Sequence, residues 1–314
     1  MARIAVLDDY QRAAHGFADW SRLDAHEVTF FHEPLDEPGE TLAGFDVVCA
    51  MRERTAFPAE LFDRLPELRL LVTTGMRNAA IDMDAATAHG VTLCGTEVPS
   101  TPTAELTWSL ILALARRIPV EDAGMRAGGW QTTVGVGLDG KTLGILGLGR
   151  LGSIVARYGT AFGMRLVAWS ENLTAERAAG CGAELVTKDE LFSGSDVVTV
   201  HLVLSRRTRG LIGAHELGLM KPSAFFVNTS RGPIVDEAAL LDVLDRGAIA
   251  GAGIDVYDRE PLPADHPLRR ATNTVLTPHL GYVTEDTYRV FYGQTVENVE
   301  AFLAGSPVRV IGRP

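Results

Sequence analysis

Short apolar runs rich in β-branched residues alternate with longer stretches of helical pattern along almost the whole chain. Near-continuous apolar strands separated by helices are typical of a parallel sheet that is covered on both faces. The sequence therefore predicts an α/β fold with parallel sheets. The predicted strands are RIAVLD (3–8), DVVCA (46–50), LRLLVT (68–73), VTLC (91–94), TLGILG (142–147), RLVAW (165–169), DVVTVH (196–201), AFFVNT (224–229), AGIDV (252–256) and NTVLTP (273–278).

The strands fall into an early and a late group, and a length of 314 residues suits about two domains. The early group ends at a Pro/Ser/Thr cluster, residues 98–103, which predicts a linker. The following segment, 104–117, is apolar on nearly every side and predicts a long buried helix. A second crossing between domains is expected near Gly281, before a final helix over 288–303.

Charge and cysteine usage exclude several classes of protein. The formal net charge of −11 argues against nucleic acid and against an anionic membrane surface as partners. The three cysteines form no Cys-x-x-Cys or Cys/His cluster, so we expect neither disulfides nor a metal site. The N-terminus carries acids at Asp8 and Asp9 and does not resemble a signal peptide. These features predict a cytoplasmic protein.

The glycine motif Gly147-Leu148-Gly149-Arg150-Leu151-Gly152 is the strongest local signal. It follows a predicted strand directly and opens a helical run, which is the context that a dinucleotide-binding turn requires. Gly147 would permit the tight turn, Gly149 would let a pyrophosphate approach the backbone, and Gly152 would let helix and strand pack closely. The motif therefore predicts a dinucleotide cofactor.

The residues that would contact the adenosine ribose leave the choice between NAD and NADP open. An acid usually follows the second strand and binds the ribose 2′-hydroxyl. Here that position holds Ser170, with Glu171 and Asn172 beside it. Ser170 and Asn172 could bind a 2′-phosphate with charge from Arg206 and Arg207, which favours NADP; Glu171 as the ribose ligand would instead favour NAD.

Three residues with complementary chemistry follow three late strands. Arg231 comes after AFFVNT, Glu260 after AGIDV and His279 after NTVLTP. Ligands of open α/β sheets bind at the carboxyl ends of strands, so we expect these side chains to share one edge. Arginine binds a carboxylate in bidentate fashion, and a histidine paired with a glutamate can exchange a proton near neutral pH.

These motifs resemble those of the D-isomer-specific 2-hydroxyacid dehydrogenases, which include glyoxylate/hydroxypyruvate reductases and phosphoglycerate dehydrogenases. The matching stretches are MRERT (51–55), TTGMRNAAID (73–82), TAEL (103–106), GKTLGILGLGRLG (140–152), NTSRGPIVDEAAL (228–240), GIDVYDREP (253–261) and TPHLG (277–281). The resemblance implies two Rossmann-like lobes, with a coenzyme lobe (99–283) inserted into a flavodoxin-like catalytic lobe (1–98 and 284–314). It also implies a homodimer formed largely through the coenzyme lobe, including the helix after Thr103 and the segment around Trp130.

The resemblance also implies a reaction and the residues that carry it. A small 2-keto acid and its D-2-hydroxy acid would interconvert by hydride transfer with NAD or NADP, with Arg231 on the substrate and His279, paired with Glu260, as proton donor or acceptor. Asp255 would hold the nicotinamide carboxamide. Substrate contacts are expected at Arg52, Gly75, Met76 and Arg77. Cofactor contacts are expected at Thr103, Gly147, Gly149, Arg150, Leu151, Gly152, Ser170, Glu171, Asn172, His201, Thr208, Thr229, Ser230, Asp255, His279 and Gly281.

The chain departs from the family pattern at the substrate side. The usual Gly-x-Gly loop reads Gly75-Met76-Arg77, and Arg-Ser-x-Thr reads Arg52-Glu53-Arg54-Thr55. The departures leave the identity of the acid open, and Arg52, Arg54 and Arg77 could bind a second anionic group. An alternative function, a dinucleotide-sensing corepressor, also remains open, because such proteins can keep the Arg–Glu–His set.

Overall fold

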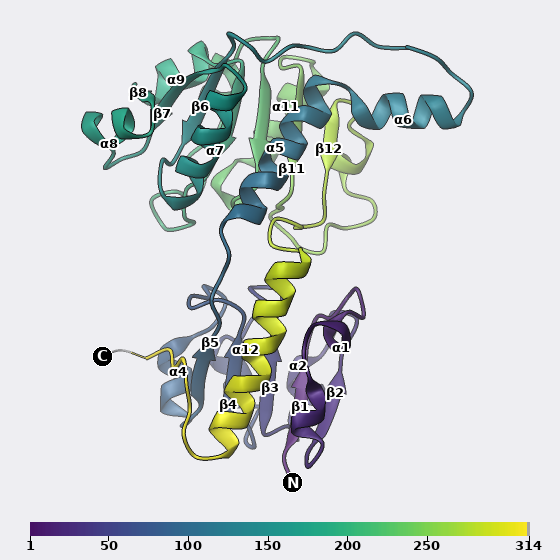
Figure 1. Cartoon of the computed structure of the whole chain (residues 1–314), viewed down its shortest axis with the longest axis vertical. Coiled ribbons are helices and arrows are strands. Elements are labelled where there is room, and N and C mark those ends of the chain that lie inside the picture. Colours follow the sequence, from purple (N-terminus) through teal and green to yellow (C-terminus); the bar gives the residue numbers. More distant parts are fainter. Residues whose placement is uncertain (313–314) are drawn as a thin grey trace. The chain divides into compact units, whose positions relative to one another are not determined.

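The computed structural model describes residues 1–312 and contains two compact units. Unit 1 comprises Met1–Pro99 and the C-terminal segment that begins at Val283. Unit 2 comprises Ser100–Tyr282. The chain therefore leaves unit 1 once and returns to it once (Figure 1).

Unit 1 contains a five-stranded parallel sheet in the order β2-β1-β3-β4-β5. This is the flavodoxin-like order, which reverses direction between β1 and β3. Its strands are β1 (Arg3–Val6), β2 (Glu27–Phe30), β3 (Val47–Ala50), β4 (Leu70–Thr73) and β5 (Thr92–Gly95). Its helices are α1 (Ala14–Phe17), η1 (Trp20–Leu23), α2 (Pro38–Thr41), α3 (Ala59–Phe62), α4 (Met83–Ala88) and α12 (Glu285–Leu303).

Helix α12 belongs to unit 1 although it lies at the other end of the sequence (Figure 1). Thr284 begins the helix by accepting a hydrogen bond from the Thr287 amide. Its buried face, which includes Phe291 and Val299, packs against β4 and β5. This packing explains why the last helix returns to the first sheet, since both surfaces are apolar and need cover.

Unit 2 contains a seven-stranded parallel sheet in the order β12-β11-β10-β9-β6-β7-β8. Counted from its own first strand, the order is 3-2-1-4-5-6-7, the dinucleotide-binding order with one strand added. Its strands are β6 (Thr142–Leu146), β7 (Arg165–Trp169), β8 (Ala183–Leu185), β9 (Val197–Val200), β10 (Phe225–Asn228), β11 (Gly251–Ile254) and β12 (Thr274–Leu276). Its helices are α5 (Thr101–Ala115), α6 (Ile118–Arg126), α7 (Arg150–Ala161), α8 (Ala175–Gly180), α9 (Lys188–Gly194), α10 (Ala214–Leu219), η2 (Gly232–Ile234), α11 (Glu237–Asp245) and η3 (Pro267–Arg270).

All ten predicted strands are present, and both sheets are parallel, which confirms the predicted α/β class with two Rossmann-like sheets. Two short strands, β2 and β8, were not predicted. The predicted linker over 98–103 is wrong in its second half, because α5 already begins at Thr101. Pro102 lies in the first turn of that helix, where a missing backbone N–H costs no hydrogen bond.

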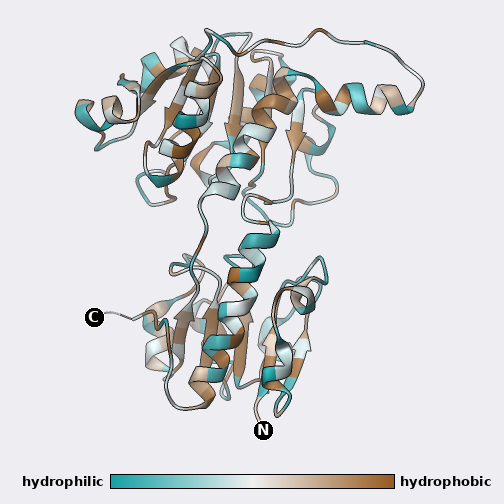
Figure 2. Cartoon of the chain, viewed as in Figure 1, coloured by the Kyte–Doolittle hydropathy of each residue, from teal (hydrophilic) through white to brown (hydrophobic). Residues whose placement is uncertain are grey.

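The central strands supply the cores of both units. Strands β3, β4, β9, β10 and β11 are buried at every position, and Figure 2 shows them as mainly apolar. Helices cover both faces of each sheet, so a strand in the middle has no polar side. No helix within residues 1–312 has both the length and the apolar character needed to cross a lipid bilayer.

Candidate active site

The carboxyl ends of β10, β11 and β12 lie side by side at one edge of the unit 2 sheet. The three strands are parallel neighbours, and Asn228 pairs with Ile254, which pairs with Leu276. The segments that follow them therefore meet, and they carry Arg231, Glu260 and His279, respectively. The predicted convergence of these three strand ends is confirmed.

His279 and Glu260 form a short hydrogen-bonded pair at this edge. The Nδ1 of His279 lies 2.6 Å from Oε2 of Glu260, and the Tyr257 amide donates to Oε1 at 2.9 Å. Burial opposes the charge of Glu260, but the hydrogen bonds from His279 and Tyr257 and the nearby charge of Arg231 outweigh it and hold the pKa of Glu260 below its ordinary value. Glu260 is thus an anion that orients the imidazole and leaves Nε2 available for proton exchange.

Asp255 organises the loop that carries His279. The side chain is fully buried, and its carboxylate accepts hydrogen bonds from the Thr277 hydroxyl (2.6 Å) and the amides of Leu280 (2.7 Å) and Gly281 (3.0 Å). Burial raises the pKa of Asp255, although these donors act in the opposite direction. The contacts hold His279 at a φ of 54°, a strained value for a residue with a side chain.

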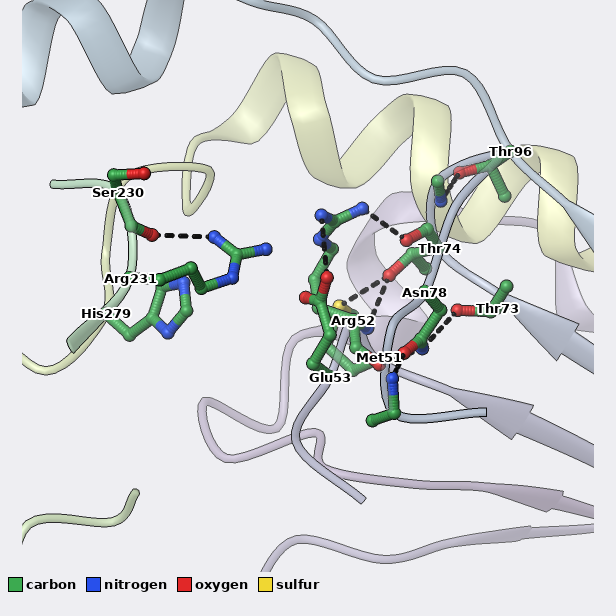
Figure 3. Close-up of polar contacts among 12 residues, drawn as sticks. Met51, Arg52, Glu53, Thr73, Thr74, Asn78, Thr96, Ser230, Arg231 and His279 are labelled. Atoms are coloured by element: carbon green, nitrogen blue, oxygen red, sulfur yellow. Dashed lines mark hydrogen bonds and ion pairs between the residues drawn. The ribbon is translucent and has the colours of Figure 1, made fainter. Parts of the chain in front are cut away.

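Arg231 is oriented by its own segment. Its Nη1 donates to the Ser230 carbonyl at 2.7 Å, and the Ser230 hydroxyl donates to the Leu202 carbonyl. A Cβ on the next residue, Gly232, would lie 2.1 Å from the carbonyl carbon of Tyr257, so only glycine allows the Arg231 segment to lie this close to the Glu260 loop. Figure 3 shows Arg231 beside His279. A residue that binds the substrate carboxylate would need such a position, next to a proton donor.

The glycine turn between β6 and α7 has the geometry that dinucleotide binding requires. Gly147 has a φ of +96°, which favours glycine, and a Cβ on Gly152 would lie 2.1 Å from the Gly147 carbonyl oxygen. A Cβ on Gly149, in contrast, would have no heavy atom within 4 Å, so this glycine faces open space before the helix N-terminus. The turn lies where the sheet order reverses, between β6 and β9, and it fits a pyrophosphate.

The other predicted cofactor residues differ in exposure and in whether their side chains already form hydrogen bonds. Ser170 is half-buried after β7, whereas Glu171, Asn172, Arg206 and Arg207 are exposed. Several hydroxyls are already engaged: Thr103 donates to the Gly281 carbonyl at 2.9 Å, Thr208 donates to the Val203 carbonyl at 2.7 Å, and Thr229 pairs with Thr107 at 2.8 Å. Arg150 and Leu151 begin helix α7.

His201 follows β9 and faces the glycine turn. A Cβ on Gly147 would lie 2.8 Å from the His201 carbonyl carbon. Its Nε2 lies 3.0 Å from the Thr199 hydroxyl, and its buried Nδ1 has no hydrogen-bond partner among residues 1–312. Burial lowers the pKa of His201 to about 3, so the imidazole is neutral at physiological pH.

The predicted substrate residues lie at the carboxyl ends of unit 1 strands. Arg52 follows β3, and its Nη1 donates to the Thr74 carbonyl at 2.8 Å (Figure 3). Gly75 follows β4 with a φ of +101°, a conformation that favours glycine. Met76 and Arg77 are exposed.

Sequence reasoning missed the residues that shape this edge. The Thr74 hydroxyl accepts from the Arg52 amide at 2.9 Å, the Thr96 hydroxyl accepts from the Gly75 amide at 2.9 Å, and Asn78 donates to the Arg52 carbonyl at 2.6 Å. Their signal was available, since Thr74 and Thr96 come directly after predicted strands, where ligands and their supports gather.

Comparison with known proteins identifies the family. The protein family described as "D-isomer specific 2-hydroxyacid dehydrogenase, NAD binding domain" matches this chain over residues 108–281. A glyoxylate reductase of Aeropyrum pernix is 41% identical over 265 residues, which cover 81% of this chain and 79% of that protein. A D-3-phosphoglycerate dehydrogenase of Bacillus subtilis is 37% identical over 289 residues, 91% of this chain but 55% of that protein.

The fold comparison agrees. The crystal structure of a putative D-3-phosphoglycerate dehydrogenase from Ralstonia solanacearum superposes with a TM-score of 0.93 at 37% identity and covers 100% of this chain and 99% of that one. The relatives bear the names of oxidoreductases, so the comparisons do not favour the corepressor alternative. The chain therefore belongs to the D-isomer-specific 2-hydroxyacid dehydrogenases, nicotinamide-dependent oxidoreductases that interconvert 2-keto acids and D-2-hydroxy acids.

Proposed function

We propose that this protein reduces a small 2-keto acid to its D-2-hydroxy acid, with His279 as the proton donor and Arg231 as the ligand of the substrate carboxylate. The observation that carries the proposal is the 2.6 Å pair between His279 and Glu260, placed with Arg231 at adjacent strand ends. The reduced nicotinamide, when bound, supplies the hydride that reduces the keto carbon. Glyoxylate is the first substrate to test, because the Aeropyrum relative is a glyoxylate reductase.

The chain's own residues would carry the rest of the reaction. Glu260 keeps Nδ1 of His279 engaged, so Nε2 gives its proton to the carbonyl oxygen as that oxygen becomes a hydroxyl. The guanidinium of Arg231 would orient the acid and polarise its carbonyl. In oxidation, the same imidazole would take the hydroxyl proton. Residues 1–98 and 284–314 would form the substrate domain, and 99–283 the dinucleotide-binding domain.

Replacement of His279 tests the proton donor. His279→Ala should lower kcat by roughly 10²–10⁴-fold, because a positioned acid is worth about that much. His215→Ala is the matched control, since His215 is an exposed histidine of the same unit that pairs with Asp189 at 3.3 Å. Near wild-type kcat in His279→Ala, or an equal loss in the control, would refute the assignment.

The cofactor preference is proposed to be NADP. Support comes from Ser170, a neutral half-buried residue at the end of β7, and from the exposed Asn172 next to it. Introducing an acid with Ser170→Asp should lower kcat/KM with NADPH at least tenfold while leaving NADH less affected, because a carboxylate repels a 2′-phosphate. A wild-type enzyme that strongly prefers NADH would overturn this proposal.

We also propose a cytoplasmic homodimer formed through unit 2. Helix α6 has no buried residue, although it presents Ile118, Val120 and Met125 to solvent. Trp130, on the segment that follows, is 74% exposed. An apolar surface of this kind marks a contact site, and a second copy is the partner that the family implies.

A further inference from the structure

Arg52 and Glu53 form an ion pair at the point in unit 1 where the sheet order reverses. Both residues follow β3. In the sheet β3 lies beside β1 and not beside β2, so the strand order reverses between β1 and β3. The Nη2 of Arg52 lies 3.6 Å from Oε1 of Glu53, and the two side chains are only 17% and 20% exposed. Such a switch point is where ligands of doubly wound sheets bind, and low exposure limits the screening of the charges by water.

The position of Arg52 is built by its surroundings. The residue has a φ of 52°, which costs energy for any residue with a side chain. Thr74 accepts from its backbone amide at 2.9 Å, and the Thr74 carbonyl accepts from its Nη1 at 2.8 Å. Arg52 is thus oriented with Nη1 on the main chain and Nη2 towards Glu53, as Figure 3 shows.

The next arginine is also engaged within unit 1. Arg54 lies over the ring of Tyr10, 4.4 Å from its centroid, and its Nη1 donates to the Asp8 carbonyl at 3.3 Å. Arg77 is exposed, where solvent screens its charge. Arg52 and Arg54 are therefore oriented by different groups of unit 1.

We propose that Glu53 is a specificity-determining residue that restricts the substrate to 2-keto acids without a second anionic group. The inference rests on the proposed function, because it takes this edge of unit 1 as the substrate edge. Glu53 offsets the charge of Arg52 and repels an anion that approaches it.

The relatives make the distinction concrete. One named relative is a glyoxylate reductase, and another is a D-3-phosphoglycerate dehydrogenase. Glyoxylate carries one carboxylate, whereas the keto acid of a phosphoglycerate carries a phosphate as well. A carboxylate at position 53 is compatible with the first chemistry and opposes the second, because like charges brought together in a poorly hydrated site repel strongly.

The test compares substrates that differ only by one anionic group. The kcat/KM values for hydroxypyruvate and 3-phosphohydroxypyruvate, and for pyruvate and oxaloacetate, are measured with wild type and with Glu53→Gln. Wild type should prefer the acid with one anionic group in each pair, and Glu53→Gln should raise the ratio of kcat/KM for the substrate with two anionic groups to that for the substrate with one about tenfold. Glu60→Gln is the matched control, since it removes an exposed acid from α3 of the same unit and should leave the ratio unchanged.

Two further variants separate the mechanism from a folding effect. Arg52→Gln combined with Glu53→Gln should lose the gain, because the released charge of Arg52 is its source. Glu53→Ser also removes the carboxylate, with a smaller side chain, and should behave like Glu53→Gln even if the amide packs poorly. Turnover with an unchanged ratio in both Glu53→Gln and Glu53→Ser, or a wild type that prefers the acids with two anionic groups, would overturn the inference. A wild type that reduces no 2-keto acid would instead overturn the proposed function on which it rests.

Discussion

Each unit contains a proposed site residue in a strained conformation. His279 and Arg52 have φ values of 54° and 52°, and each comes within three residues of a strand's carboxyl end. A non-glycine residue keeps such a conformation only where its surroundings impose it. For His279 these surroundings include Asp255, which accepts the amides of Leu280 and Gly281. Local strain at these two positions is therefore maintained by dedicated hydrogen bonds.

His201, a single buried residue, predicts how the stability of the protein depends on pH. Its folded-state pKa is about 3, against about 6.5 in an unfolded chain, so the folded state resists protonation. Stability from this residue is fully present above pH 6.5 and is lost as the pH falls towards 3. Between pH 7.5 and 5, wild type should lose about 2 kcal/mol more of its free energy of unfolding than His201→Asn, which cannot titrate.

Urea unfolding of both proteins at pH 7.5 and pH 5 measures this difference, because the other titrating groups are common to the two proteins. Asparagine keeps a polar group beside Thr199, so the comparison isolates the proton. An equal loss of stability in wild type and His201→Asn would show that the imidazole titrates normally in the folded protein.

At the scale of elements, two glycines of the turn between β6 and α7 have different roles: one is needed for packing and the other for cofactor binding. Gly152 is needed for packing, since its Cβ would lie 2.1 Å from the Gly147 carbonyl oxygen, whereas a Cβ on Gly149 would meet nothing within 4 Å. Gly149→Ala should therefore keep the melting temperature of the free protein but weaken cofactor binding about tenfold or more, because the methyl occupies the space proposed for the pyrophosphate. Gly152→Ala should lower the melting temperature itself.

Thermal unfolding without cofactor and a titration of NADPH fluorescence measure the two effects independently. Each glycine variant serves as the control for the other, because both add one methyl to the same turn. Loss of stability in Gly149→Ala, or unchanged stability in Gly152→Ala, would contradict the division of roles.

The two strands that the sequence patterns missed lack the apolar runs that predicted the other ten. The central strands are covered on both faces, so their apolar runs were recognised without a structure. Strands β2 and β8 lie at sheet edges, and the segments EVTF and AEL contain exposed acids, Glu27 and Glu184. The exposed acids interrupt the apolar run in β2 and β8, whereas the other two edge strands, β5 and β12, keep such a run and were predicted.

The candidate site shows the same division. Strand ends placed Arg231, Glu260 and His279 together, because parallel strands share their carboxyl edge. The Arg52–Glu53 pair could not be predicted, since adjacent residues in sequence have no fixed side-chain geometry and the φ of Arg52 depends on Thr74. The substrate's charge preference depends on this pair, which is why sequence reasoning left a second anionic group open.

For the whole molecule, net charge is a poor guide to what the site binds. The chain carries a formal charge of −11, yet the groups proposed to hold the substrate are arginines at strand ends. Net charge averages over the surface, whereas a small anion is bound by a few side chains and amides within a few ångströms. An acidic protein can therefore bind an acidic substrate, and selectivity depends on which arginines are neutralised locally.

The proposed dimer rests on an apolar surface that is organised but uncovered. Helix α6 has nine residues with none buried, and so short a helix is marginal alone. Glu121 orders the return segment, because its carboxylate accepts the Thr133 amide and hydroxyl, both at 2.6 Å. In Figure 1, α6 and the segment after it extend away from the unit 2 sheet. A surface held in shape but left open is expected to be completed by another chain.

Changing this surface should therefore change the mass of the protein in solution. Trp130→Glu combined with Met125→Glu places two charges on exposed apolar positions and should convert a dimer into a monomer at micromolar concentration. Val308→Glu is the matched control, since Val308 is 41% exposed but lies in unit 1. Light scattering coupled to gel filtration should give twice the chain mass of 33.8 kDa for wild type and the control, and once that mass for the double variant. A monomeric wild type would show that the proposed dimer does not form. A double variant that stays dimeric would place the interface elsewhere, because an apolar contact does not tolerate two unpaired buried carboxylates.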